Sequence, residues 1–405
     1  MTQRRAAIIL ICLGMASCDP RLPSEPDLYV DFESIDAPTA VLSDTSRLLM
    51  NGVYEVVQGG SELGSSVVGS WIGNRFRISS QHDVVYSITA GGSSGDSIKL
   101  RGYMRVVRSG SGSRVRFQVS SRDGAREVIA GLLPAALRIL GETETGTTLE
   151  LRRLRSITPD PFAVLAHRGG GRNSDRLGIS ENSVEMIVYA GTLGATGVEV
   201  DVKRTRDGQL ILFHDDTFSP RTVQGAYLLG KVEKYDLAQI QSLGKLINGE
   251  RIPTLKEALT AVVDNTGLSM VWLDVKDPAS VAQVVGLQKE MKVYAAGRGR
   301  DSLSILLGIP SQEVLDAYLP YQGDSDALVE LEAQTALDLP RCKVWAPVWT
   351  RNISNADVTA MHARGKQVFT WTVDLRESIL MYLNRVDGIL SNYPTMVAAL
   401  RDSRN

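Results

Sequence analysis

The sequence lacks several features that would point to particular classes of protein. Only three of its 405 residues are cysteines, and two of them, Cys12 and Cys18, lie near the N-terminus, so no disulfide framework is expected in the mature chain. No stretch approaches the ~20 apolar residues that a membrane-spanning helix requires. The formal net charge of −2 lacks the basic excess of nucleic-acid binders, and nucleic acid is not an expected partner.

The N-terminus has the features of a secretory signal. Arg4 and Arg5 precede an apolar run over residues 6–15, which ends in the letters MASC at Cys18. A basic start, a short apolar region and small residues before a cleavage point define such a signal. The ending resembles a bacterial lipobox, which implies removal of residues 1–17 and lipidation of the Cys18 thiol; a plain signal peptide with a chance cysteine is the alternative. We therefore expect a lipid-anchored protein of the bacterial cell envelope.

Composition divides the first part of the chain into two segments. Residues 18–48 are rich in proline, serine and aspartate without helical periodicity, which predicts a tether. Residues 49–157 alternate apolar and polar side chains in short runs, for example over 114–119, and predict an all-β domain. We expect an antiparallel barrel or sandwich of roughly six to eight strands, with a short helix within 127–140. A spacer, an envelope adaptor and a wall of an active site are its open roles.

From residue 158 to residue 405, apolar strands alternate with helical stretches. The strands are rich in β-branched residues, as in parallel sheets that are covered on both faces. The expected strands are 162–166, 196–202, 209–213, 268–275, 302–308, either 327–331 or 344–349, 367–373 and 388–392. This order predicts an α/β fold in which a (β/α)8 TIM barrel follows the all-β domain.

Polar residues stand at or near the ends of the first three of these strands. His167 and Arg168 follow the first strand, Glu199 and Asp201 lie two residues apart on the second, and His214 follows the third. Because side chains alternate along a strand, the two carboxylates leave from the same face. TIM barrels carry their active sites at the carboxyl ends of the strands, so we expect these five residues to converge there.

A later strand brings a third acid to the same place. Asp274 and Lys276 share one face of their strand by the same alternation. If Glu199, Asp201 and Asp274 meet, their repulsion requires a cation, and ligands that are all oxygen suit Mg²⁺ or Ca²⁺. A salt-bridged surface is the alternative arrangement for these acids.

The order of motifs is similar to the signature of the glycerophosphodiester phosphodiesterase family. The matching segments are HRGG at 167–170, EN at 181–182, EVDVKRTRDG at 199–208, HDDTFSPRT at 214–222, IPTL at 252–255, WLDVK at 272–276, FTWTV at 369–373 and DGI at 387–389. The resemblance covers about residues 160–405 and does not reach the all-β segment. It implies a phosphoric diester hydrolase that uses one divalent metal ion, Mg²⁺ or Ca²⁺, to convert glycerophosphodiesters into an alcohol and sn-glycerol 3-phosphate.

The resemblance also implies roles for individual residues. These are His167 and His214 for acid–base catalysis, Glu199, Asp201 and Asp274 for the metal, and Arg168, Lys276, Glu181 and Trp371 for the substrate or its phosphate. Arg168 offers a planar fork that matches two phosphate oxygens. Glu181 either caps the first barrel helix or orients Arg168. Trp371 either lines the pocket beside the alcohol or packs in the barrel core.

Two alternatives remain beside this interpretation. Most members of the family have glutamate at the third metal position, whereas Asp274 resembles a lipid-cleaving branch similar to sphingomyelinase D. Cleavage of lysophospholipids or other lipid phosphodiesters, with a cyclic phosphate product, is therefore one alternative, and water and a substrate hydroxyl both remain candidate nucleophiles. The other is a catalytically dead barrel that serves as a binding scaffold. The expected partners are a small glycerophosphodiester and, through Cys18, a membrane; the oligomeric state is not predicted.

Overall fold

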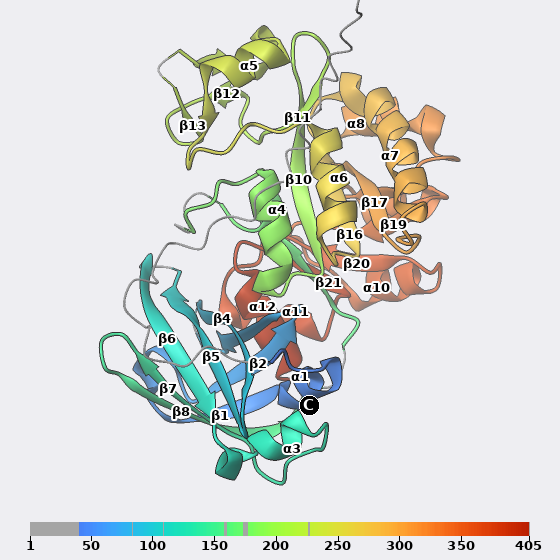
Figure 1. Cartoon of the computed structure of the whole chain (residues 1–405). Coiled ribbons are helices and arrows are strands. Elements are labelled where there is room, and N and C mark those ends of the chain that lie inside the picture. Colours follow the sequence, from blue (N-terminus) through green and yellow to red (C-terminus); the bar gives the residue numbers. More distant parts are fainter. Residues whose placement is uncertain are drawn as a thin grey trace, which may run out of the picture.

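The described part of the chain contains two β-barrels with different strand directions (Figure 1). The computed structural model describes residues 40–82, 84–107, 109–157, 160–172, 177–225 and 227–404. The expected signal peptide, the lipidation site Cys18 and most of the expected tether lie outside these residues.

Eight antiparallel strands close the first barrel, in which β1 pairs with both β2 and β8. The strands are β1 (Gly52–Gln58), β2 (Ser66–Ile72), β3 (Arg75–Ser80), β4 (Val85–Ser94), β5 (Ser97–Val106), β6 (Ser111–Val119), β7 (Arg138–Thr143) and β8 (Thr148–Ser156). Two tight connections begin with a glycine at positive φ, Gly73 and Gly95, a conformation that such two-residue hairpins favour. Inward side chains such as Tyr54, Phe76 and Phe117 form the core of this barrel.

Three short helices accompany the first barrel: α1 (Asp44–Met50), α2 (Gly60–Leu63) and α3 (Ala125–Ile129). The helix α1 begins inside the segment expected to be a tether, 18–48, and ends two residues beyond it. Its N-cap is Ser43, whose side chain accepts from the Ser46 backbone N–H, and Met50 is fully buried. The helix expected within 127–140 ends at Ile129, and β7 begins at Arg138.

Eight parallel strands close the second barrel, because β9 pairs with both β10 and β21. The strands are β9 (Ala163–Ala166), β10 (Gly197–Arg204), β16 (Met270–Val275), β17 (Ser304–Ile309), β18 (Ala327–Val329), β19 (Cys342–Trp345), β20 (Gln367–Thr370) and β21 (Gly388–Ser391). The surrounding helices are α4 (Val184–Ala190), α6 (Leu255–Asn265), α7 (Val281–Ala296), α8 (Gln312–Tyr318), α9 (Ala333–Asp338), α10 (Asn355–His362), α11 (Arg376–Leu383) and α12 (Pro394–Asp402). The predicted TIM barrel is confirmed.

Two expectations about the barrel strands were wrong. The strand expected at 209–213, β11 (Leu210–Leu212), pairs antiparallel with β10 and lies outside the closed ring. The connection over 205–209 is too short for the crossover that parallel strands require, so the chain turns back as a hairpin. The ring is completed instead by both β18 and β19, which the sequence offered as alternatives for one strand.

An insert follows this hairpin and stands beside the barrel (Figure 1). It contains β12 (Thr217–Phe218), β13 (Val223–Gln224), β14 (Gly230–Lys231), α5 (Leu237–Leu243) and β15 (Lys245–Leu246). The insert has a small core of its own, in which Phe213, Phe218 and Ile240 are buried. This core fixes the segment that follows β11 and therefore the position of His214.

Side chains inside the parallel barrel form layers. One apolar layer consists of Leu165, Trp272, Leu306, Leu328, Val344, Ala346, Phe369 and Leu390. Two residues further along four of these strands, the same inward face carries a polar side chain: His167 after Leu165, Asp274 after Trp272, Glu330 after Leu328 and Asn392 after Leu390. The apolar layer thus lies directly beneath these polar side chains at the carboxyl ends of the strands, a region that we call the mouth of the barrel.

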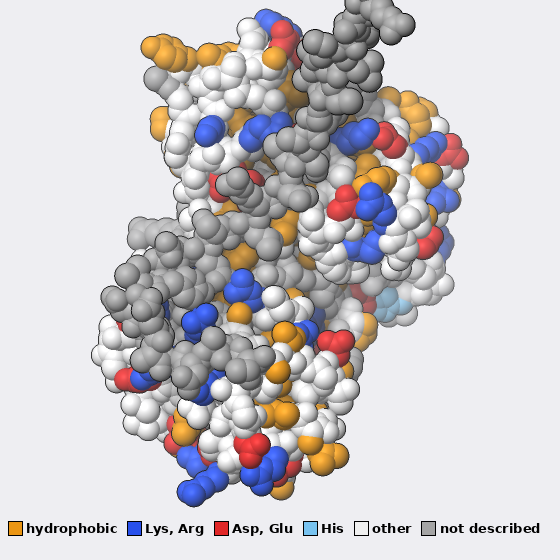
Figure 2. Space-filling model, viewed as in Figure 1, with side chains coloured by type: hydrophobic (Ala, Val, Ile, Leu, Met, Phe, Trp, Pro, Cys, Tyr) orange, Lys and Arg blue, Asp and Glu red, His pale blue; other side chains and the backbone are white. Residues whose placement is uncertain are grey.

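The outer surface carries charges of both signs. On the face seen in Figure 2, basic and acidic side chains are interspersed over the described residues. Among these residues, no helix has the length and apolar character needed to cross a membrane.

Candidate active site

Three carboxylates meet at the mouth of the parallel barrel. Glu199, Asp201 and Asp274 each offer an oxygen atom, and these atoms lie within 4.8 Å of one another. Strand register explains the meeting, because Asp201 of β10 is paired directly with Asp274 of β16. All three side chains are buried, with exposed fractions of 2%, 1% and 9%.

Two of the three acids resist ionisation in the folded chain. Burial and repulsion from Asp201 and Asp274 raise the pKa of Glu199 well above its usual value. Burial likewise raises the pKa of Asp274. Burial also opposes ionisation of Asp201, but Lys276, His214 and Arg168 outweigh it, and the pKa of Asp201 is lowered. The negative charge of Asp201 is therefore well compensated, whereas those of Glu199 and Asp274 are not.

The donor set fits a hard divalent metal ion. Two buried carboxylate oxygens, Oε1 of Glu199 and Oδ1 of Asp274, have no hydrogen-bond partner. Unpaired buried carboxylate oxygens are costly, and oxygen ligands of this kind suit Mg²⁺ or Ca²⁺. Lys276 supplies the positive charge on one side only: its ammonium group donates to Asp274 and lies 3.5 Å from Asp201 Oδ1.

His167 lies beside Glu199. Its Nε2 lies 3.9 Å from Glu199 Oε2, and its Nδ1 lies 2.7 Å from Oδ1 of Asn392. The Asn392 amide donates in turn to Asp374 Oδ2 at 2.6 Å, which leaves Asn392 Oδ1 to accept a proton from Nδ1. Nε2 is therefore the nitrogen that faces the mouth without a proton. Burial lowers the pKa of His167 to about 4, and the nearby Arg168 charge acts in the same direction.

His214 reaches the mouth from the hairpin rather than from a barrel strand. The Phe213 backbone N–H donates to the Asp201 carbonyl at 3.1 Å, which places His214 beside the acids. Its Nδ1 lies 2.8 Å from Asp215 Oδ1, and a carboxylate can only accept, so Nδ1 carries the proton. Arg221 donates to both oxygens of Asp215 and holds it in place.

Arg168 and Glu181 form a buried ion pair at the edge of the mouth. Arg168 Nη1 donates to Glu181 Oε1 at 3.0 Å, and Arg221 Nη2 donates to the same oxygen at 3.1 Å. Arg168 adopts a left-handed backbone conformation at φ 53, in which its N–H donates to Glu199 at 2.8 Å. The helix α4 is capped by Ser183, so Glu181 contacts arginines rather than capping the helix.

Trp371 lies at the end of β20, half-buried on the inward face. It packs against the apolar layer, and its indole N–H donates to the Ala346 carbonyl at 2.7 Å. The structure thus brings together the predicted histidines, acids, Arg168 and Lys276. Trp371 contacts the apolar layer beneath them, and Cys18 lies outside the described residues.

The sequence reasoning missed five residues that hold the site together: Asn182, Asp215, Arg221, Asp374 and Asn392. Asn182 bridges to Asp201, donating to Oδ2 at 2.9 Å and accepting from its N–H at 3.1 Å. Asn182, Asp215 and Arg221 stand inside the quoted motifs, so the signal was present. Asp374 and Asn392 follow apolar strands, the same pattern that identified His167 and His214.

A sixth missed residue, Glu330, follows β18 and shares its inward face with Leu328. Its Oε1 atom is buried without a partner. Burial, followed by repulsion from Asp274, raises the pKa of Glu330 well above its usual value. The mouth therefore contains a fourth acid, on the opposite side of the ring from His167.

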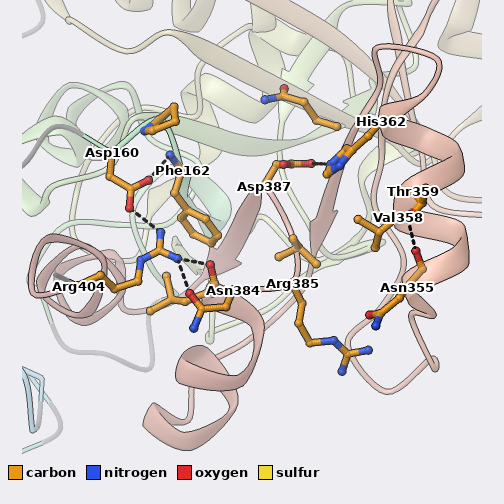
Figure 3. A pocket seen from close by; sticks show the side chains of 14 residues that line it. Asp160, Phe162, Asn355, Val358, Thr359, His362, Asn384, Arg385, Asp387 and Arg404 are labelled. Atoms are coloured by element: carbon orange, nitrogen blue, oxygen red, sulfur yellow. Dashed lines mark hydrogen bonds and ion pairs between the residues drawn. The ribbon is translucent and has the colours of Figure 1, made fainter.

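A cavity of about 600 Å³ lies at the other end of the barrel, where β20 and β21 begin (Figure 3). There His362 Nε2 lies 2.8 Å from Asp387 Oδ2, and Arg404 donates to Asp160 at 2.6 Å. Another basic residue of the cavity, Arg385, donates to the Ile353 carbonyl, and the cavity contains none of the predicted site residues. Because TIM barrels place their chemistry at the carboxyl ends of the strands, the candidate site is the mouth and not this cavity.

Comparisons with known proteins find similarity to one family. Residues 167–299 match the model of the glycerophosphoryl diester phosphodiesterase family. A glycerophosphodiester phosphodiesterase of Caldanaerobacter subterraneus is 28% identical over 255 residues, which are 59% of this chain and 97% of that relative. Glycerophosphodiester phosphodiesterase 1 of Mus musculus is 35% identical over 140 residues, which are 32% of this chain and 39% of the mouse protein. The chain thus has homologues named as glycerophosphodiester phosphodiesterases, which are phosphoric diester hydrolases.

A solved structure is also similar. It is that of an Oleispira antarctica phosphodiesterase in complex with the product sn-glycerol-3-phosphate. The TM-score is 0.49 and the sequence identity 24%, and the match covers 60% of this chain and 97% of that chain.

Proposed function

We propose that the chain is a metal-dependent phosphoric diester hydrolase that converts a glycerophosphodiester into an alcohol and sn-glycerol 3-phosphate. One observation carries the proposal: His167 directs Nε2 toward a buried set of carboxylates with unpaired oxygens, and His214 follows a strand that is hydrogen-bonded beside them. Such a site offers a base, an acid and a cation position together, as phosphodiester cleavage requires. The names of the relatives support the same class of substrate.

The residues that would hold the metal ion are Glu199, Asp201 and Asp274. When bound there, Mg²⁺ or Ca²⁺ would neutralise the carboxylates and polarise a phosphoryl oxygen. Asn182 orients Asp201 through its two hydrogen bonds. The Arg168 backbone N–H orients Glu199, so two of the three ligands are fixed before any ion arrives.

The two histidines divide the proton transfers. His167 is neutral at pH 7, because burial lowers its pKa to about 4, so its Nε2 removes the proton from the attacking hydroxyl or water. His214 is more exposed, and its Nδ1 donates to the Asp215 carboxylate, which orients the ring. We assign to it the donation of the proton to the departing alkoxide. Water and a free substrate hydroxyl use the same pair, and the second gives a cyclic phosphate first.

Positive side chains complete the phosphate site. Arg168 is anchored by Glu181 through one nitrogen, and its buried Nε has no hydrogen-bond partner. Lys276 is held between Asp274 and Asp201; burial lowers its pKa, but these two carboxylates raise it more, so the ammonium stays charged. Both groups can offset the negative charge that develops on the phosphoryl oxygens.

Substrate profiling tests the proposal. The soluble form that starts after Cys18 would be incubated with glycerophosphocholine, glycerophosphoethanolamine, glycerophosphoinositol and a lysophospholipid. We expect release of sn-glycerol 3-phosphate from at least one of the first three. Turnover of the lysophospholipid alone, with a cyclic phosphate product, would replace the proposal by the lipid-cleaving alternative that Asp274 permits.

We propose further that the enzyme is anchored to a membrane of the bacterial cell envelope through a lipid on Cys18. The N-terminal signal and the small residues before Cys18 support this proposal. The Cys18→Ser variant should move from the membrane fraction to the soluble fraction after cell lysis. Equal membrane association of both proteins would contradict the anchor.

Removal of the fourth acid should stabilise the metal-free protein in a pH-dependent way. Glu330 has a raised pKa in the folded chain, so the folded state binds its proton more tightly than the unfolded state does. The stability that this proton provides is complete below the unfolded pKa of about 4.5 and is lost as pH rises toward the folded pKa. The stability advantage of Glu330→Gln should therefore grow by about 1.4 kcal/mol per pH unit over that window.

Urea unfolding at several pH values in the presence of a chelator measures this difference. Comparing the variant with the wild type cancels the opposite contribution of His167, which has a lowered pKa in both proteins. A stability difference that does not change with pH would show that Glu330 titrates normally in the folded protein.

A further inference from the structure

We infer that the N-terminal barrel is a wall of the active site, which holds the loop carrying Asp374 and thereby positions Asn392 and His167. The inference rests on the proposed function for its activity readout. It assigns to the first domain a role in catalysis rather than that of a spacer.

The two barrels share one apolar core. The outward side chains of the first barrel at this contact are Val84, Tyr86, Ile88, Tyr103 and Val107, and they belong to the same buried cluster as residues of α4 and α12. Each of the five is at most 4% exposed. The hydroxyl groups of Tyr103 and Tyr189 are hydrogen-bonded across the contact. In Figure 1 the first barrel accordingly lies against α12 and α4.

Polar contacts fix the relative orientation of the barrels. Buried Arg77 of β3 lies 3.6 Å from buried Asp402 at the end of α12. Arg155 donates to the Ser403 carbonyl at 2.6 Å. A shared apolar core and directional polar bonds together hold the first barrel in one orientation relative to the second. Other contacts of the first barrel are therefore made from a fixed position.

The first barrel also contacts the rim of the catalytic mouth. The connection between β3 and β4 meets the end of the loop after β20, where Arg376, the first residue of α11, donates through Nε to the Gln81 carbonyl at 2.9 Å. Arg105 donates to the Leu177 carbonyl, in the loop after β9, at 3.3 Å. Val84 and Val107 line a small recess together with Gly170 and Asn392. Contacts therefore reach the three mouth loops that follow β9, β20 and β21.

The contact at Arg376 is two residues from the start of a hydrogen-bond chain that ends on His167. Asp374 accepts from the Asn392 N–H at 2.9 Å and from the Asn392 side chain at 2.6 Å. Asn392 Oδ1 then accepts from His167 Nδ1. Each bond of the chain sets the next, so a shift of the 374–376 segment changes the tautomer and the aim of His167.

The Arg376→Ala variant tests this coupling. Loss of the bond to Gln81 should lower kcat roughly 10-fold, while KM and the dissociation constant for Mg²⁺ stay unchanged. Arg376→Lys should recover part of the loss. Arg385 provides a matched control, because it follows the same helix and donates to the Ile353 carbonyl at 2.5 Å on the cavity side of the barrel; Arg385→Ala should leave kcat unchanged.

A double-mutant cycle separates positioning from general damage. If Arg376 acts through Asn392, its replacement should lower kcat in the wild type but have little further effect in Asn392→Ala. Equal losses in both backgrounds, or no loss in the wild type, would overturn the inference.

A readout without turnover keeps this test independent of the proposed function. The chain has only four histidines, so ¹⁵N-histidine spectra of the metal-free protein resolve the ring nitrogens of His167. We expect proton-bearing Nδ1 in the wild type and in Arg385→Ala, and a mixture of tautomers in Arg376→Ala. If the wild type were inactive but the spectra of Arg376→Ala still differed from it in this way, only the proposed function would be contradicted. Identical spectra of the wild type and Arg376→Ala would contradict the inference itself.

Discussion

Replacement of His167 by alanine should lower kcat by roughly 10²- to 10⁴-fold, the range expected when a general acid or base is removed. The reason is geometric: His167 Nε2 is the unprotonated nitrogen that faces the acids, 3.9 Å from Glu199. His214 cannot take over this position, because its Nδ1 is bonded to Asp215. Steady-state rates with a glycerophosphodiester at saturating Mg²⁺ measure the loss.

An exposed histidine outside the mouth, His362, provides the control. His362 also pairs with an aspartate, Asp387 at 2.8 Å, but it lies in the cavity at the opposite end of the barrel (Figure 3). His362→Ala should keep full activity. If His167→Ala retained activity like that of His362→Ala, the proposed acid–base pair would be wrong, whatever the metal dependence.

Replacement of Glu199 by glutamine should have opposite effects on metal binding and on stability. Loss of a direct ligand should weaken Mg²⁺ binding by more than the roughly 10- to 100-fold that loss of an outer partner produces, and activity should fall with it. The metal-free variant should nevertheless be more stable than the metal-free wild type, because burial and the charges of Asp201 and Asp274 raise the pKa of Glu199. Glutamine retains an oxygen for the Arg168 N–H.

Calorimetric titration with Mg²⁺ and urea unfolding in chelator measure the two effects on the same protein. Asp277→Asn is a suitable control, because Asp277 pairs with Arg204 at 3.0 Å and belongs to no metal-ligand set. It should leave the Mg²⁺ affinity unchanged. A Glu199→Gln variant that binds Mg²⁺ as tightly as the wild type would show that the acids are not the metal site.

The sequence identified the mouth because its chemistry is local in the chain. His167, Glu199, Asp201 and His214 lie within one stretch, and strand alternation alone places the two acids on one face. The prediction of a parallel third strand was wrong, yet His214 still lies beside Asp201, because the hairpin returns the chain to the same end of β10. The TRDG turn at 205–208 was a readable signal for that hairpin.

The remainder depends on contacts between residues far apart in the chain. Asn392 is 225 residues from His167, the side chain that it orients, and no spacing rule links them. Glu330 follows an apolar strand as the other acids do, but that strand was offered only as one of two alternatives. The role of the first barrel depends on its outward side chains. The alternation of side chains along its strands predicts an outward face but does not predict which part of the chain packs against it.

The most direct test of the central claim is a ³¹P NMR time course of the wild-type soluble form with a glycerophosphodiester. The spectra would be recorded with Mg²⁺, with chelator, and with Mg²⁺ restored. The account predicts conversion of the diester resonance into that of sn-glycerol 3-phosphate with Mg²⁺, no conversion in chelator, and recovery when the ion returns. Conversion at an equal rate in chelator would contradict a metal-dependent site at Glu199, Asp201 and Asp274, and no conversion of any diester would contradict the hydrolase itself.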